Sequence, residues 1–299
     1  MSNIISLLFK RQARFPATRW VFFFFLTLGL MTGWKCAQAS TARQLLQPGN
    51  HARQFFLGET SKTGLPDQRI ASQTAPAELK NLLTQIDTAA SRGDVKTVMQ
   101  FYSPNFTHGD GLNRQSMEKA LTALWKRYPQ LRYTTQLESW KSEGNVIVAN
   151  TVTTIIGLPS SNSNNLALKA TIKSRQRVAG KTILHQDILS ERTQLTSGAK
   201  PPQIDIKLPQ QIKVGQQYNF DAIVNEPLGE DFLLGTAMEE PVQADKYLNP
   251  TPVDLELLSS GGLFKVGRAP STPGSQWLSA VIMRGDGMTM VTQRVQVVK

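Results

Sequence analysis

The chain has almost no cysteine and little histidine, which limits the chemistry that it can perform. Cys36 is the only cysteine in 299 residues, so no disulfide can form within the chain. The only histidines, His51, His108 and His185, lack the spacing of metal ligands, so we expect no metal site. The sequence also has no phosphate-binding glycine loop, Rossmann fingerprint or nucleophile elbow, so we expect no cofactor.

Acidic residues are absent from the first 39 positions. This segment contains five Lys and Arg residues, and Trp20–Met31 is an apolar run of 12 residues. A basic start followed by such a run predicts a signal peptide over residues 1–39, cleaved between Ala39 and Ser40. An uncleaved membrane anchor is the alternative, although crossing the bilayer takes about 18–20 apolar residues. Lipidation of Cys36 is a third possibility, but the residues before it do not resemble a lipobox.

Residues 40–75 contain few apolar side chains. Leu45-Leu46 and Phe55-Phe56-Leu57 are the apolar islands in a stretch rich in Gln, Ser, Thr, Gly and Arg. This composition predicts a flexible linker, with docking of the islands onto the folded body or a partner as the alternative. Removing residues 1–39 lowers the net charge from +11 to +6, so nearly half of the basic excess belongs to the predicted targeting signal.

The spacing of apolar residues changes from helical to strand-like within residues 76–195. Apolar side chains three and four positions apart predict three helices, and Asp94 and Asn113 are placed to cap the second and third. Alternating side chains and turn residues then predict four strands in succession. The expected helices cover 77–90, 95–102 and 114–128, and the expected strands 131–138, 146–156, 166–179 and 182–192. This order predicts an α+β arrangement, with three helices on one face of a curved four-stranded antiparallel sheet.

Three short stretches carry a resemblance to a known superfamily. They are Arg92-Gly93-Asp94, Phe101-Tyr102-Ser103-Pro104-Asn105-Phe106, and the segment from Gly180 to Asp187. With the order of elements around them, residues 76–195 resemble the nuclear transport factor 2-like superfamily, whose fold is an α+β cone. The resemblance implies a pocket between sheet and helices, where ketosteroid isomerases, dehydratases and polyketide cyclases of this superfamily place acid–base residues. The aromatic residues expected at this pocket are Tyr102, Phe106, Trp125 and Trp140.

His185 and Asp187 are the candidate catalytic residues. They lie two positions apart, on one face of the last predicted strand of the cone, where such a pair could fix the imidazole tautomer and move a proton. The alternative is a solvated rim position, or ligand contact without catalysis. Because Ile183 and Leu189 share their face, the alternation does not decide which side is buried. His108 and Asp110, in the loop after the second helix, are interpreted as turn residues.

A row of basic residues is predicted on one face of a single strand. Its members all occupy odd-numbered positions and so share one face, while apolar residues take the opposite face. The row consists of Lys169, Lys173, Arg175, Arg177 and Lys181. One interpretation is a solvated sheet face, and the other is a dock for anionic lipid, polysaccharide or an acidic partner.

Residues 200–299 predict a second, all-β domain. Prolines at 201 and 202 mark the boundary, and seven short strand patterns follow, separated by Pro, Gly and Asn. They cover 204–208, 217–224, 232–238, 253–258, 263–266, 277–283 and 288–298. This density of strands is typical of a β-sandwich. The stretches Ile204-x-Ile206-x-Leu208-Pro209 and Val214-Gly215-x-x-Tyr218-x-Phe220 resemble bacterial immunoglobulin-like domains.

We therefore expect an exported bacterial protein of Gram-negative or cyanobacterial type, located in the periplasm or secreted. Its cone domain would bind a small apolar ligand or a protein partner, and its immunoglobulin-like sandwich would present or dock it. The alternative is an isomerase, dehydratase or cyclase using acid–base residues in the cone pocket. A homodimer through the cone sheet is also possible, and nucleic acid is not expected because the chain is exported. Membrane contact would require a retained signal or a lipidated Cys36.

Overall fold

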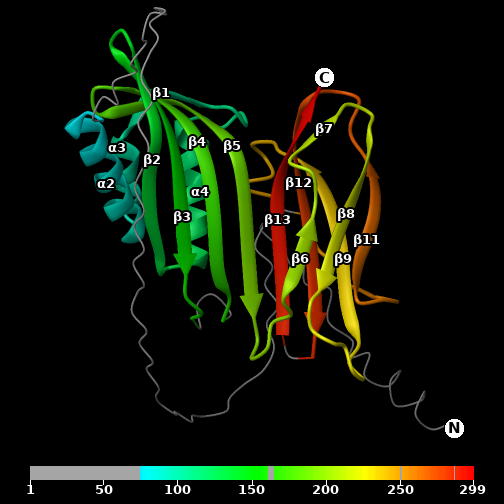
Figure 1. The fold of residues 1–299 in the computed structure, drawn as a ribbon. Coiled ribbons are helices and arrows are strands. Elements are labelled where there is room, and N and C mark those ends of the chain that lie inside the picture. The colour runs from blue at the N-terminus through cyan, green and yellow to red at the C-terminus, as the bar shows by residue number, and fades with distance from the viewer. Residues whose placement is uncertain (1–74, 161–164, 250, 286) are drawn as a thin grey trace, which may run out of the picture. The chain divides into compact units, whose positions relative to one another are not determined.

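The computed structural model describes residues 75–160, 165–249, 251–285 and 287–299. The predicted signal peptide at 1–39 and nearly all of the predicted linker at 40–75 lie outside these residues. The described part of the chain is mostly β-sheet with few helices (Figure 1). None of its helices has the length and apolar character needed to span a membrane.

Within the described residues, three helices precede the long strands and lie in one region of the molecule (Figure 1). They are α2 (Ala77–Ser91), α3 (Val95–Gln100) and α4 (Arg114–Arg127). Two of them begin at the predicted caps. Asp94 accepts a hydrogen bond from the Thr97 amide at 3.0 Å, and the side chains of Asn113 and Ser116 form a reciprocal capping box. The predicted helices are therefore confirmed, except that the second ends at Gln100.

The four strands predicted after the helices are present and antiparallel. They are β2 (Leu131–Glu143), β3 (Val146–Gly157), β4 (Ala167–Ala179) and β5 (Thr182–Ser197). A further strand, β1 (Tyr102–His108), lies parallel to β5 and was not predicted. Its pairing depends on a strand far away in sequence, so the local pattern around Pro104 gives no sign of it.

The sheet does not stop at β5, which corrects the prediction of a four-stranded sheet. It continues through strands of the second half to form a ten-stranded sheet, in which β13 lies next to β5. The added strands are β7 (Gln211–Lys213), β9 (Leu233–Pro241), β10 (Glu256–Leu257), β12 (Gly274–Arg284) and β13 (Gly287–Val298). The reason is the length of β5. Residues 183–186 of β5 lie in register with β1, and residues 192–197 pair with β13, so one edge of β5 serves both partners.

A second, three-stranded sheet packs on this extension. It contains β6 (Ile204–Lys207), β8 (Gln217–Val224) and β11 (Gly262–Arg268). The two sheets share a buried apolar cluster that includes Phe220, Leu278 and Val295. All seven strand patterns predicted after residue 200 correspond to strands, and the three-residue β7 is an addition.

The core below the helices draws residues from both halves of the chain. One buried cluster combines Trp125 and Leu168 of the first half with Val281, Met288 and Met290 of the second. The described residues from Pro76 to Lys299 fall within one compact unit. The halves are therefore joined by pairing, through β5 and β13, and by a shared core.

Candidate functional site

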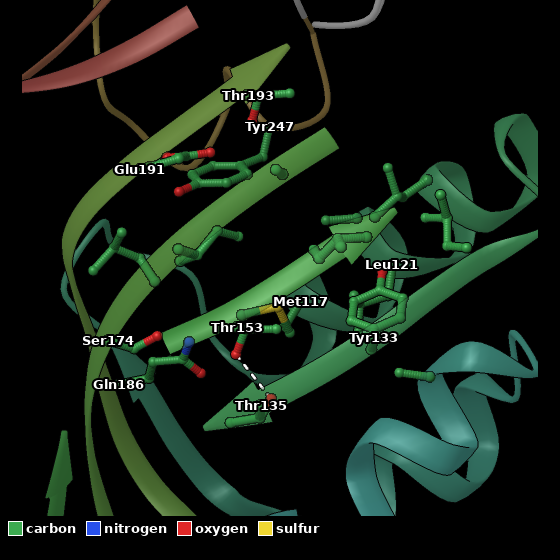
Figure 2. A pocket seen from close by; sticks show the side chains of 18 of the residues that line it. Met117, Leu121, Tyr133, Thr135, Thr153, Ser174, Gln186, Glu191, Thr193 and Tyr247 are labelled. Carbon is green, nitrogen blue, oxygen red and sulfur yellow. Dashed lines mark hydrogen bonds between the residues drawn. The ribbon is translucent and has the colours of Figure 1, made fainter. Parts of the chain in front are cut away.

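A cavity of about 280 Å³ lies between the helices and the large sheet (Figure 2). Side chains from α2 and α4 form one wall, and alternate residues of β2 to β5 form the other. Four residues of the second half also line it, namely Tyr247, Trp277, Met290 and Thr292. Small side chains such as Ala120 leave room between the layers, while most of the remaining wall is apolar.

A hydrogen-bonded chain of three polar residues lies in the wall of the cavity. The Thr135 hydroxyl donates to Asp87 Oδ1 at 2.7 Å, and the Thr135 amide donates to Asp87 Oδ2 at 2.6 Å. The hydroxyls of Thr135 and Thr153 are 2.9 Å apart on neighbouring strands, the contact drawn in Figure 2. Asp87 thus joins α2 to β2 in the wall of the cavity.

Two glutamines face each other across β4 and β5. Gln176 and Gln186 are cross-strand partners, and both line the cavity. Their Oε1 atoms are buried, with no hydrogen-bond partner among the described residues. Gln176 is only 7% exposed. Because a buried polar atom without a partner costs free energy, this pair is a polar site suited to a ligand or to ordered water.

A buried charged cluster lies beside the cavity, along β5 between its β1-paired and β13-paired segments. Arg294 of β13 donates to both carboxylate oxygens of Asp110, at 2.9 and 2.7 Å, and its Nη2 lies 3.4 Å from Glu191 Oε2. The Tyr247 hydroxyl donates to Asp110 Oδ2 at 2.5 Å, and the Trp277 indole donates to Glu191 at 3.0 Å. Figure 2 shows Tyr247 next to Glu191 at one end of the cavity.

The cluster shifts the pKa values of its members. Burial alone would raise the pKa of Asp110, but the hydrogen bonds and charge of Arg294 outweigh it and hold this pKa below its usual range. Burial and the nearby carboxylates Glu191 and Asp110 raise the pKa of Tyr247 well above its usual value. At neutral pH the cluster therefore combines an ionised Asp110, a neutral Tyr247 and a charged Arg294.

His108 lies at the end of β1 and lines the cavity. Burial lowers the pKa of His108, and the charge of Arg294 lowers it further, although Asp110 acts in the opposite direction. Its Nδ1 accepts a hydrogen bond from the Asp110 amide at 3.1 Å. The ring is therefore neutral at neutral pH and carries its hydrogen on Nε2. This histidine was interpreted as a turn residue, and the structure corrects that interpretation.

The predicted catalytic pair does not line the cavity. His185 Nε2 lies 3.0 Å from Asp187 Oδ1, and His185 Nδ1 lies 2.7 Å from the Thr107 hydroxyl, so the predicted contact between the pair exists. Their side chains are 31% and 41% exposed. The inward positions of this part of β5 belong to Gln186 and Ile188. Alternation along the strand therefore puts His185 and Asp187 on the other face, which corrects their expected place in the pocket.

The four predicted pocket aromatics divide into two groups. Tyr102 and Trp125 line the cavity. Phe106 is buried against Tyr102, with ring centroids 4.8 Å apart, and is not part of the wall. Trp140 packs against a separate apolar cluster beneath α2. For Phe106 and Trp140 the expectation is wrong, because each fills core space beside the cavity.

The basic row on β4 and the turn after it is exposed, as predicted. Lys173 and Arg177 form ion pairs with Glu138 and Glu143, each at 3.0 Å. The Arg175 Nε donates to Asn150 Oδ1 at 3.3 Å. Neighbouring carboxylates therefore offset part of the positive charge of this face, which favours the interpretation as a solvated sheet surface.

Three residues of the charged cluster were missed from the sequence, namely Glu191, Tyr247 and Arg294, and so were the polar wall residues Asp87, Thr135, Thr153, Gln176 and Gln186. They come from segments that are far apart, so no local motif joins them. One signal was available, because Arg294 is the only charged residue in an otherwise apolar and polar strand, Met288–Val298. A single charge in a strand whose other residues are all uncharged indicates a buried ion pair.

Comparison with known proteins gives one family and several distant structures. Residues 199–298 match the family described as a domain of unknown function, DUF8623. No curated protein matches the chain.

Among solved structures, a cystatin-like protein of unknown function from Nostoc punctiforme is 11% identical, covering 37% of this chain and 86% of that one, with a TM-score of 0.30. A protein from Shewanella putrefaciens described as SnoaL-like is 14% identical over 44% of this chain and 92% of that one, with a TM-score of 0.29. An LEH-like epoxide hydrolase from Mycobacterium tuberculosis is 12% identical over 37% and 80%, with a TM-score of 0.28. Because these TM-scores are low, the strand pairing of this chain alone establishes its fold. No activity of these proteins is assigned to it.

Proposed function

We propose that this protein binds a small, largely apolar molecule in the cavity between the helices and the large sheet. The observation that carries the proposal is a cavity of about 280 Å³ with apolar walls and the unpaired glutamine oxygens of Gln176 and Gln186. An engineered apolar cavity of about 150 Å³ is large enough to bind benzene. Natural ligand pockets begin near 300 Å³ and combine apolar walls with a few polar groups.

We also propose a fold and a role for each half of the chain. Residues 76–195 would be a nuclear transport factor 2-like cone that holds the ligand, and residues 200–299 an immunoglobulin-like sandwich that helps to present it. Helices packed on an antiparallel sheet support the first assignment, and two sheets around one apolar cluster support the second. Tyr247 and Trp277 also line the cavity, which supports a contribution of the second half to binding.

A cavity-filling variant tests the proposal. Ala170 lines the cavity from β4, and in Ala170→Phe the ring would occupy the space of the ligand. Naphthalene should raise the thermal midpoint of the natural protein, because a ligand bound only by the folded state stabilises it. The shift should disappear in Ala170→Phe and persist in Thr171→Phe, which alters the opposite face of the same strand. An equal shift in all three proteins would refute binding in this cavity.

A second candidate function is acid–base catalysis of the isomerase, dehydratase or cyclase kind, with Glu191 as the base. The supporting observation is that Glu191 lines the cavity while the Trp277 indole and Arg294 hold its Oε2 in place. A fixed carboxylate in a mainly apolar cavity is suited to removing a proton next to a carbonyl. The test is deuterium exchange at the α-carbon of 2-tetralone, followed by NMR. Glu191→Gln should abolish the exchange while 2-tetralone still binds, and no exchange by the natural protein would exclude this candidate.

We extend the proposal to location, on the strength of the sequence of residues 1–39. The protein would act in the periplasm or outside the cell, after cleavage between Ala39 and Ser40. Mass spectrometry of the protein isolated from its host tests this directly. A mature chain that starts at Ser40 is expected, and one that retains residues 1–39 would contradict it.

Association through the exposed face of the cone sheet is a further part of the proposal. That face carries the basic row from Lys169 to Lys181, which is available either to a second copy or to an acidic partner. Sedimentation at micromolar concentration would detect the homodimer. Charge reversal at Lys173 and Arg175 should weaken capture of an acidic partner. Unchanged capture would contradict a docking role and support the interpretation of this face as a solvated surface.

A further inference from the structure

The charged side chains in the described wall of the cavity are all acidic. Apart from tyrosines, the ionisable residues in the described wall are Asp87, His108 and Glu191, and no Lys or Arg side chain belongs to it. His108 is neutral at neutral pH, as shown above. Arg294 lies behind Glu191 but is shared with Asp110, so this group of three keeps one excess negative charge. A bound anion would therefore meet carboxylates with no facing cation in surroundings of low polarity.

The hydrogen-bond direction at Thr153 is also fixed. The Thr135 hydroxyl has one hydrogen, and it donates that hydrogen to Asp87. In the contact between the two threonine hydroxyls, Thr153 must therefore be the donor. The Thr153 hydroxyl has then used its hydrogen and offers the cavity only an acceptor.

The glutamine pair adds two more acceptors. The carbonyl oxygens of Gln176 and Gln186 are buried without a partner among the described residues, and both side chains belong to the cavity wall. Gln176 is more than nine-tenths buried, so bulk water does not compensate for the missing hydrogen bond. A ligand group that donates a hydrogen bond would relieve this cost, whereas a carboxylate would not.

We propose that the natural occupant of the cavity is an uncharged apolar molecule with a hydroxyl group, an alcohol or a phenol, and that the cavity rejects carboxylic acids in their ionised form. This inference rests on the proposed binding function. The hydroxyl hydrogen would go to an oxygen of Thr153 or of the glutamine pair. His108, through Nε2, supplies a donor in the same wall for the hydroxyl oxygen.

Four two-ring probes of matched size separate the possibilities, with the full-length protein at pH 7. They are 2-naphthol, which can donate, 2-methoxynaphthalene, which can only accept, naphthalene, and 2-naphthoate, an anion. We expect 2-naphthol to bind about three- to tenfold more tightly than 2-methoxynaphthalene, the worth of one hydrogen bond. We expect 2-naphthoate to bind more weakly than naphthalene. Equal binding of 2-naphthol and 2-methoxynaphthalene, or tight binding of 2-naphthoate, would overturn the inference.

Two pairs of variants test which wall residues recognise the hydroxyl group of the ligand. Thr153→Val and Gln186→Met remove single acceptors from the wall, and Thr154→Val and Gln194→Met make the same changes at positions outside the cavity wall, on the same strands. The measured quantity is the ratio of 2-naphthol to 2-methoxynaphthalene affinity within each protein, which a general loss of packing does not change. The ratio should fall toward one in at least one wall variant and stay unchanged in both controls.

The two levels of the proposal fail differently. If none of the four probes binds, the binding function itself is wrong, and the hydroxyl preference is wrong with it. If naphthalene binds but 2-naphthol has no advantage, the cavity binds ligands and only the hydroxyl preference is refuted. A ratio that remains unchanged in both wall variants would also refute the assignment to Thr153 and the glutamine pair.

Discussion

Arg294 is the single side chain on which the charged cluster depends. Its side chain is 1% exposed and makes close contacts with two carboxylates, Asp110 and Glu191. We expect Arg294→Met to lower the free energy of unfolding by about 3–5 kcal/mol, because it leaves buried negative charges without a partner. Urea unfolding measures this loss. Arg132→Met, at an exposed position of β2, is the control, and a loss no larger than that of the control would contradict the role of Arg294.

Asp110 makes the stability of the folded protein depend on pH, with a loss of stability in acid. Its pKa is lower in the folded protein than in the unfolded chain, so its contribution to stability is complete above the unfolded value, about 3.9. The contribution is lost as the pH falls through the folded value. The stability difference between the natural protein and Asp110→Asn should therefore be constant from about pH 5 to neutrality and shrink below about pH 4. Chemical denaturation at several pH values checks this, and a difference that grows on acidification would refute it.

At the scale of single residues, local signals were predictable and alternation over a long strand was not. Asp94 and Asn113 cap helices as predicted, because a cap needs only residues three positions away. The inward position of Glu191 could not be predicted, because β5 contains a bulge. Ile188 pairs with Ser174 of β4, but Ser190 pairs with the next residue, Lys173, so Leu189 is an extra residue without a partner in the ladder. Strict alternation would place Glu191 with His185 and Asp187, whereas this bulge turns it toward the cavity.

At the scale of helices and strands, the predictions succeeded where the pattern was long. The helices and the four strands of the first half have strong periodicity, and most of their boundaries agree with the structure within a few residues. The strands β1 and β7 were missed for a common reason. Each pairs in parallel with a distant strand, β5 or β13. The strand β7 has only three residues, and β1 contains Pro104, which was interpreted as the end of the second helix.

Gly287 tests how the hairpin of β12 and β13 packs against the connection that follows β5. A Cβ atom at Gly287 would collide with the carbonyl oxygen of Lys200 and lie 2.7 Å from the nitrogen of Pro201, both backbone atoms. We expect Gly287→Ala to cost about 1–3 kcal/mol of stability, because the backbone must move. Gly274→Ala, where nothing lies within 4 Å, should be close to neutral. Equal thermal midpoints for the two variants would show that the connection does not press on this hairpin.

At the scale of the whole molecule, the sequence did not reveal that one sheet runs through both halves. Residues 196–202, with glycine and two prolines, have the composition of a linker between domains. The structure instead holds this segment against the hairpin, where the Thr289 hydroxyl donates to the Pro202 carbonyl at 2.6 Å. The sequence of a strand does not specify which other strand pairs with its edge, so the pairing of β5 with β13 could not be predicted from either strand alone.

A continuous sheet and a shared core predict that residues 76–299 unfold together. Val281 is fully buried in β12, in the cluster that also contains Trp125 and Leu168 of the first half. Val281→Ala should cost about 2 kcal/mol and lower the hydrogen-exchange protection of β3 and β4 as well as that of β12. Urea unfolding should remain a single transition when it is followed by tryptophan fluorescence and by circular dichroism. Two separate transitions, or a loss of protection confined to residues 200–299, would mean that the halves behave as independent domains despite their common sheet.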